Sequence, residues 1–228
     1  LTLESAPKSL AAFPYLNFLL GEMKLSRMDK DADIPLQTYI KSFKGNSYMK
    51  SASQKLAWHA LLVESDKPLY QSRIAKVNDV GNTMLDEDKS AQKEYDSGTA
   101  PNTTLLRARI QFDGGFFTEA LKTLIQSSST TFTAEESLEF TYRLGRIHDE
   151  LSNQSDAISY YQMTMQNGAE SKRYFAANSS LMMGLLYEKS GNPNKALEAF
   201  KACSSFNNSE YRNSILQKAK AGIQRLSN

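Results

Sequence analysis

The stretch SLMMGLLYEKSGNPNKALEAF, residues 180–200, contains two segments with helical spacing of apolar residues, separated by a Gly-Asn-Pro break. Gly184 is followed by Ala196 twelve residues later and by the ring of Phe200 four residues further on. Because glycine and alanine have almost no side chain, two helices can approach closely at these positions, and a ring can fill the remaining space. The stretch therefore predicts a hairpin of two α-helices.

The same pattern recurs earlier in the chain. Residues 141–161, TYRLGRIHDELSNQSDAISYY, have at these three positions Gly145, Ala157 and Tyr161. A further copy has Ala108, Ala120 and Leu124. The alanines of successive copies, Ala120, Ala157 and Ala196, are 37 and 39 residues apart. Self-similarity at such a period is typical of a repeat architecture.

These residues resemble the tetratricopeptide repeat (TPR), whose pattern is W-x2-L-G-x2-Y and then A-x3-F over about 34 residues. The chain lacks the Trp at the first position and the Pro at the end. Stretches such as PYLNFLLGEMKLSRMD and LLRARIQFDGGFFTEAL are also similar to TPR-repeat proteins of bacteria. The resemblance implies a right-handed superhelix, or α-solenoid, of helical hairpins whose first helices line a concave groove.

Helical signals fill the rest of the chain, and strand signals are scarce. Thr133 with Glu136 three residues later forms a capping-box pattern. Asn192 before Pro193 predicts a helix in which Asn is the N-cap and Pro the first residue. Clusters of helix-breaking residues divide the chain into about twelve segments of roughly 10–18 residues, which is the length of ordinary helices. The sequence therefore predicts an all-α fold of about twelve helices.

Three regions are expected within one continuous superhelix. Residues 1–100 match the repeat pattern only in part, for example at the Leu-Gly pair Leu20-Gly21, and we interpret them as degenerate TPR-like hairpins. Residues 101–208 contain the three clearer repeats, and 209–228 form a C-terminal capping helix, because a solenoid needs a polar outer face at its end. A membrane-surface helix is the alternative for this last segment, but its apolar stripe has no Trp or Phe anchor.

The composition excludes several classes of function. The 228 residues carry a formal net charge of +2, with Lys and Arg scattered among acids, which argues against nucleic-acid binding. One Cys cannot form an intrachain disulfide, and two His leave little room for a zinc site. No apolar run approaches the roughly 18 residues of a spanning helix, so we expect no membrane insertion.

Catalytic motifs are absent from the sequence. The run Asp29-Lys-Asp31-Ala-Asp33 begins like a calcium loop, but Ile34 takes the place of the required glycine, so we interpret it as an interhelix loop. His148 takes the aromatic position of the repeat, and His59 follows Trp58 on an apolar helix, so packing roles are expected for both. Cys203 is expected to be buried and inert. We therefore expect no enzymatic activity, no catalytic residue, no metal site and no cofactor.

The resemblance assigns groove positions on the first helix of each clear repeat. Carried over residue by residue, the groove residues are Asn102, Leu105, Arg109, Phe112, Glu139, Tyr142, Arg143, Arg146, Asp149, Asn178, Leu181, Leu185 and Glu188. Arginine and aromatic residues, which this surface combines, are the types that most often anchor interfaces.

The hypothesis that follows is a non-enzymatic TPR scaffold or adaptor that binds a peptide or protein partner in its groove. The alternative is a helical structural or regulatory arm of a longer protein whose activity, possibly hydrolytic, lies elsewhere. The sequence is also compatible with a homo-oligomer. The first residue is Leu1 rather than Met, so we expect a trimmed N-terminus, which is compatible with a soluble periplasmic, cell-envelope or cytoplasmic location.

Overall fold

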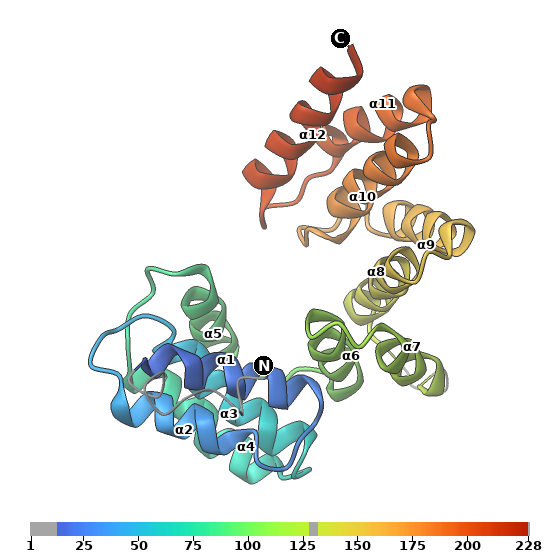
Figure 1. Cartoon of the computed structure of the whole chain (residues 1–228). Helices are drawn as coiled ribbons and strands as arrows, with labels where there is room; N and C mark the ends of the chain where they lie inside the picture. The colour runs from blue at the N-terminus through green and yellow to red at the C-terminus, as the bar shows by residue number, and fades with distance from the viewer. Residues whose placement is uncertain (1–12, 128–131, 228) are drawn as a thin grey trace. The chain divides into compact units, whose positions relative to one another are not determined.

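The computed structural model describes residues 13–127 and 132–227. These residues form twelve α-helices and two 3₁₀-helices, with no strand among them (Figure 1). The predicted all-α fold is confirmed. The chain divides into two compact units, Leu1–Phe116 (unit 1) and Phe117–Asn228 (unit 2). Each of the described hydrophobic clusters lies within one unit, so each unit has its own core.

The described residues of unit 1 form six α-helices and one 3₁₀-helix. They are α1 (Pro14–Ser26), α2 (Asp33–Ser42), α3 (Met49–Leu62), α4 (Lys67–Ala75), the 3₁₀-helix η3 (Lys76–Asp79), α5 (Asp86–Ser97) and α6 (Thr103–Asp113). Helix α3 is central, because it contacts each of the other five α-helices. Twelve of its fourteen residues are buried, so α3 forms the middle of the core of unit 1.

The start of α3 is fixed by a residue from a distant helix. Tyr48, just before α3, has a left-handed backbone with φ 58°. The buried carboxylate of Asp88, in the first turn of α5, accepts hydrogen bonds from the backbone N–H groups of Tyr48 at 2.7 Å and Ser51 at 3.0 Å. Asp88 therefore satisfies two N–H groups that a helix start leaves without intrahelical partners.

Helices α1 and α2 form a hairpin of the kind that the Leu20-Gly21 step predicts. A Cβ atom on Gly21 would collide with the side chain of Leu36 on α2. Ala32, which is fully buried, precedes Leu36 by four residues. Gly21 and Ala32 are eleven residues apart, whereas the clear copies have twelve, so the second half of this hairpin did not match the sequence pattern.

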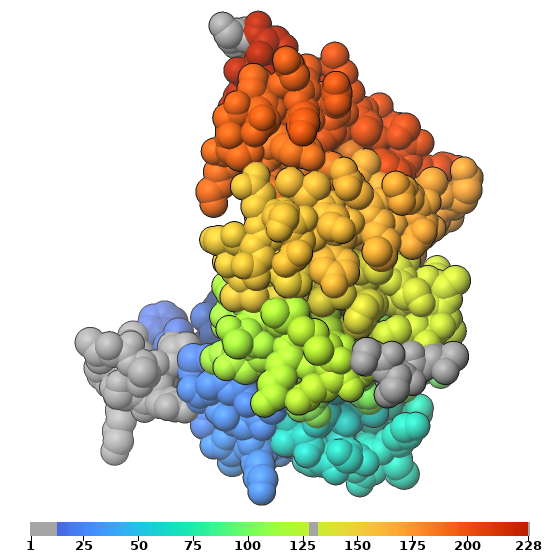
Figure 2. Space-filling model, turned by 90° about the vertical axis from the view of Figure 1, so that its right-hand side faces the viewer, coloured from blue at the N-terminus to red at the C-terminus, as the bar shows by residue number. Residues whose placement is uncertain are grey.

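Unit 2 contains the second helix of the first clear repeat, the other two clear repeats and the C-terminal helix. Its helices are α7 (Phe117–Gln126), α8 (Ala134–Glu150), α9 (Gln154–Asn167), α10 (Phe175–Lys189), α11 (Pro193–Ala202), the 3₁₀-helix η4 (Cys203–Ser205) and α12 (Arg212–Ser227). Helix α8 pairs with α9 and α10 with α11, while α9 also packs on α10, and α12 packs on α10 and α11. Figure 2 shows these pairs as successive layers, yellow for α8 and α9 and orange for α10 and α11.

The close approaches predicted at the repeat glycines are confirmed. A Cβ atom on Gly145 would lie 2.6 Å from the ring of Tyr161, and one on Gly184 would lie 2.5 Å from the ring of Phe200. Gly222 on α12 approaches the same Phe200 ring just as closely. Helix α12 therefore packs on α11 with a glycine contact like the one inside the preceding hairpin.

The two predicted helix starts of unit 2 differ in outcome. The capping box is confirmed, because the Thr133 hydroxyl accepts from the backbone N–H of Glu136 and the Glu136 carboxylate accepts from that of Thr133. Pro193 is the first residue of α11, as predicted. Asn192 is the N-cap residue, also as predicted, but its side chain does not cap the helix, because its amide donates to the backbone oxygen of Ser190.

Candidate functional site

The predicted groove residues are divided between the two units. Four of them lie in or directly before α6 of unit 1, namely Asn102, Leu105, Arg109 and Phe112. The other nine lie on α8 and α10 of unit 2. We call these nine the α8–α10 face: Glu139, Tyr142, Arg143, Arg146, Asp149, Asn178, Leu181, Leu185 and Glu188.

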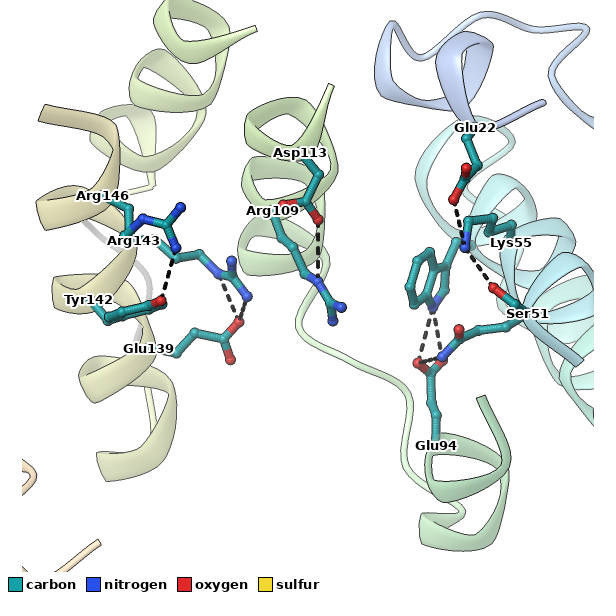
Figure 3. A network of polar contacts seen from close by, with 12 residues as sticks. Glu22, Ser51, Lys55, Glu94, Arg109, Asp113, Glu139, Tyr142, Arg143 and Arg146 are labelled. Atoms are coloured by element: carbon teal, nitrogen blue, oxygen red, sulfur yellow. Dashed lines mark hydrogen bonds and ion pairs between the residues drawn. The ribbon is translucent and has the colours of Figure 1, made fainter. Parts of the chain in front are cut away.

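A hydrogen-bonded tyrosine joins the two helices of the α8–α10 face. The Tyr142 hydroxyl oxygen accepts a hydrogen bond from Arg146 Nη1 at 3.1 Å, as Figure 3 shows. It also accepts one from Asn178 Nδ2 on α10, at 2.6 Å. The Tyr142 ring is buried against Phe175, at a centroid distance of 5.0 Å. The structure therefore brings together three of the predicted residues from successive hairpins.

Other charged residues of the α8–α10 face pair within unit 2. Arg143 forms an ion pair with Glu139 one turn earlier on α8 (Figure 3), and both side chains are largely buried. Glu188 accepts two hydrogen bonds from the Arg225 guanidinium of α12, at 2.9 and 2.7 Å, and this contact lowers the pKa of Glu188. These pairs fix the positions of the charges on the face.

The remaining residues of the α8–α10 face differ in how accessible they are. Asp149 accepts a hydrogen bond from the Tyr161 hydroxyl at 3.2 Å, and burial raises the pKa of its carboxyl group. Leu181 is buried in the core of unit 2, so it packs there and is inaccessible to a partner. Leu185, one turn later on α10, is 39% exposed. The accessible part of the face is thus Leu185 together with the half-buried charged and polar side chains.

The four residues in unit 1 have different environments. Asn102 caps α6, because its Oδ1 accepts from the backbone N–H groups of Thr104 at 3.1 Å and Leu105 at 3.2 Å. Leu105 is buried and Phe112 is half-buried. Only Arg109 lines a pocket of unit 1. The sequence predicts a groove position for Arg109, whereas α1, α3 and α5, which are outside the predicted groove, supply most of the pocket.

The pocket of unit 1 lies among α1, α3, α5 and α6 and has a volume of about 470 Å³. Its apolar lining consists of Met23, Leu25, Trp58 and Ile110. Its charged lining consists of Glu22, Lys55, Glu87, Arg109 and Asp113, joined by the polar side chains of Ser26, Ser51, Gln54 and Ser90. A volume of this size is in the range of small-molecule sites.

Lys55 of α3 is held inside this pocket. Its Nζ atom donates to Ser51 Oγ at 2.8 Å and lies 3.2 Å from Glu22 Oε1 on α1, and Figure 3 shows it between these two partners. Burial lowers the pKa of Lys55. The same Nζ atom lies 5.6 Å from the centroid of the Trp58 ring, one turn later on α3.

The indole of Trp58 is fixed by a half-buried carboxylate. Its Nε1 donates to both oxygens of Glu94 on α5, at 3.0 and 3.1 Å. Gln54 and Tyr70 also donate to Glu94, at 2.7 and 3.0 Å. Burial raises the pKa of Glu94, and the three donors oppose that shift. Glu94 therefore ties α5 to α3 and α4 and sets the orientation of the Trp58 ring.

This pocket was missed in the sequence, although one signal pointed to it. Trp58 is the only tryptophan of the chain, and Lys55 precedes it by three residues, which places both on one side of α3. Trp58 entered the sequence analysis only as the neighbour of His59 on an apolar helix, and no role was predicted for it. The residues that contact Lys55 and Trp58 lie on three other helices, and they are Glu22, Glu94 and Arg109. Nothing in their spacing along the chain connects them to α3.

The residues expected to have structural roles are buried, stacked on a ring or paired with an opposite charge. Cys203 is buried, and burial raises the pKa of its thiol to about 11. His148 stacks on Tyr160 with a centroid distance of 5.4 Å. Asp31, in the link between α1 and α2, pairs with Lys24 at 2.6 Å. Within residues 13–127 and 132–227, no group of three or more His, Cys, Asp or Glu residues could hold a metal ion.

No helix in the described part of the chain is both long enough and apolar enough to cross a membrane. Comparison of the sequence with models of known protein families and with curated proteins finds no match in either case.

Proposed function

We propose that the chain is a non-enzymatic, TPR-like scaffold that binds a protein or peptide partner through the α8–α10 face. The observation that carries the proposal is the hydrogen bond from Asn178 to Tyr142, because it joins side chains of two successive hairpins into one surface. Close packing of Gly145 and Gly184 against the rings of the second helices supports the relation to TPR hairpins.

The chemistry of the face suits partner binding. Arg143 and Arg146 project from α8 beside the buried Tyr142 ring, and exposed Leu185 adds an apolar contact on α10. Arginine is a frequent anchor of interfaces, and the buried Tyr142 ring supports the two arginines from below. Since intrachain contacts already hold these side chains, little rotamer freedom is left to lose on binding.

A charge reversal at Arg146 tests this proposal. Proteins captured from the source cell by the wild-type chain should bind an Arg146→Glu variant at least about tenfold more weakly, because a charged contact contributes about 1.5–3 kcal/mol. Lys220→Glu, an equal charge change at an exposed position of α12, should leave that affinity unchanged. Equal weakening by both variants, or by neither, would show that the α8–α10 face does not bind the captured protein.

A further inference from the structure

The pocket of unit 1 is a second candidate site, and it is built differently from the α8–α10 face. Two cationic groups share one aromatic ring there. Lys55 Nζ lies 5.6 Å and Arg109 Cζ lies 5.7 Å from the centroid of the Trp58 ring. Each cation is attracted to the indole, but the two cations repel one another. An anion placed near both would relieve this repulsion.

Both cations have hydrogen-bond donors to spare. Ser51 and Glu22 take two of the three N–H donors of Lys55. Arg109 has one contact to Asp113, in which Nε lies 3.7 Å from a carboxylate oxygen, beyond ordinary hydrogen-bond distance. Among the described residues, none accepts a hydrogen bond from the terminal amino groups of Arg109. Its guanidinium is thus available for the two parallel hydrogen bonds that it forms best with a carboxylate.

The acidic residues of the pocket do not favour a cationic ligand instead. Glu22 is paired with Lys55 and Asp113 with Arg109, so neither carboxylate is left for a cationic ligand, and Glu87 is exposed. A cationic ligand would gain most by stacking on the Trp58 ring. Lys55 and Arg109 already lie over that ring, so a third cation would meet two like charges there.

The remaining lining defines the body of the ligand. Met23, Trp58 and Ile110 supply apolar surface in a volume of about 470 Å³, which suits a compact molecule rather than an extended chain. We propose that this pocket binds a small organic acid with one carboxylate and a compact apolar body, with the carboxylate held by Arg109 and Lys55 and the body packed on Trp58. This site is independent of the proposed scaffold function of unit 2.

The single tryptophan makes the test direct. Because Trp58 is the only tryptophan in the chain, its fluorescence, excited selectively over the tyrosines, reports on this pocket alone. The full chain is titrated with hydrocinnamate, with the neutral amide of the same acid, and with phenylpropylamine. We expect a saturable change in emission with hydrocinnamate, and at least tenfold weaker responses to the amide and the amine.

Variants assign the binding to the two cations. Arg109→Gln, at a half-exposed position, should weaken hydrocinnamate binding about tenfold or more, whereas Arg27→Gln, at an arginine outside the pocket, should not change it. Lys55→Met should weaken binding as well, but its burial can impair folding, so Arg109→Gln decides the outcome. Absence of saturable hydrocinnamate binding, equal binding of the amide or amine, or unchanged binding by Arg109→Gln would each overturn the proposal.

Discussion

Single residues without a side chain determine how closely the helices of unit 2 pack. Gly184 lies against the Phe200 ring at a distance that leaves no room for a Cβ atom, and Gly222 approaches the same ring from α12. Phe200 itself is buried. The Phe200 ring thus fits between its neighbours only because two positions that are far apart in sequence, 184 and 222, carry no side chain.

Gly184→Ala tests this packing, because two effects of opposite sign compete. Alanine favours a helix interior over glycine by up to about 1 kcal/mol, whereas overpacking a core costs about 1–3 kcal/mol. We expect a net decrease in the free energy of unfolding, measured by urea denaturation. In a Phe200→Leu background the same change should cost less, since the ring that meets the new methyl group is gone. An increase in stability for Gly184→Ala alone would show that the hairpin can relax around it.

At the residue scale, the sequence was a good guide to packing and a weaker guide to exposure. Gly145 and Tyr161 could be paired because a fixed spacing in a helical hairpin fixes which side chains meet. Tyr142 and Leu181 were assigned to a binding surface, yet both are buried. Periodicity predicts the face of a helix on which a residue lies, but the depth of that face depends on the neighbouring hairpin.

At the scale of elements, one carboxylate joins three helices of unit 1. Glu94 on α5 accepts hydrogen bonds from Trp58 and Gln54 of α3 and from Tyr70 of α4. Burial raises the pKa of Glu94, so the folded chain binds this proton more tightly than the unfolded chain does. The contribution of Glu94 to stability is therefore greatest below the ordinary glutamate pKa of about 4.3, and it declines as pH rises through the folded-state pKa.

Glu94→Gln removes this titration and makes the effect measurable. As pH rises from about 4 to about 7, the free energy of unfolding of the wild type should fall relative to that of the variant. Urea denaturation of both proteins at each pH measures this difference. Glu87→Gln, an exposed change on the same helix, should show no comparable shift. If the difference were constant with pH, or moved in favour of the wild type, the Glu94 carboxylate would not control this pH dependence.

The pocket shows why a site between elements is hard to predict from sequence. Its cationic groups, Lys55 and Arg109, lie on α3 and α6, and Glu22 lies on α1. Helical spacing relates only residues on the same helix, such as Lys55 and Trp58. The packing of α3 against its neighbours brings the others together, and this packing follows from contacts spread over the whole of unit 1.

At the scale of the whole molecule, the chain consists of two helical units with separate cores. The predicted groove residues of α6 belong to unit 1, and those of α8 and α10 belong to unit 2. The proposed division of roles follows the same boundary, with a partner-binding face in unit 2 and a pocket for a small organic acid in unit 1.

Site-specific photo-crosslinking is the most direct way to learn whether the α8–α10 face binds a protein partner. A photoreactive amino acid is placed at Leu185 on this face or, as a control, at Met163 on α9, whose exposure of 42% matches the 39% of Leu185. After irradiation in the source cell, the account predicts a discrete crosslinked partner from position 185 that is absent from position 163. The same products from both positions, or none from position 185, would contradict it.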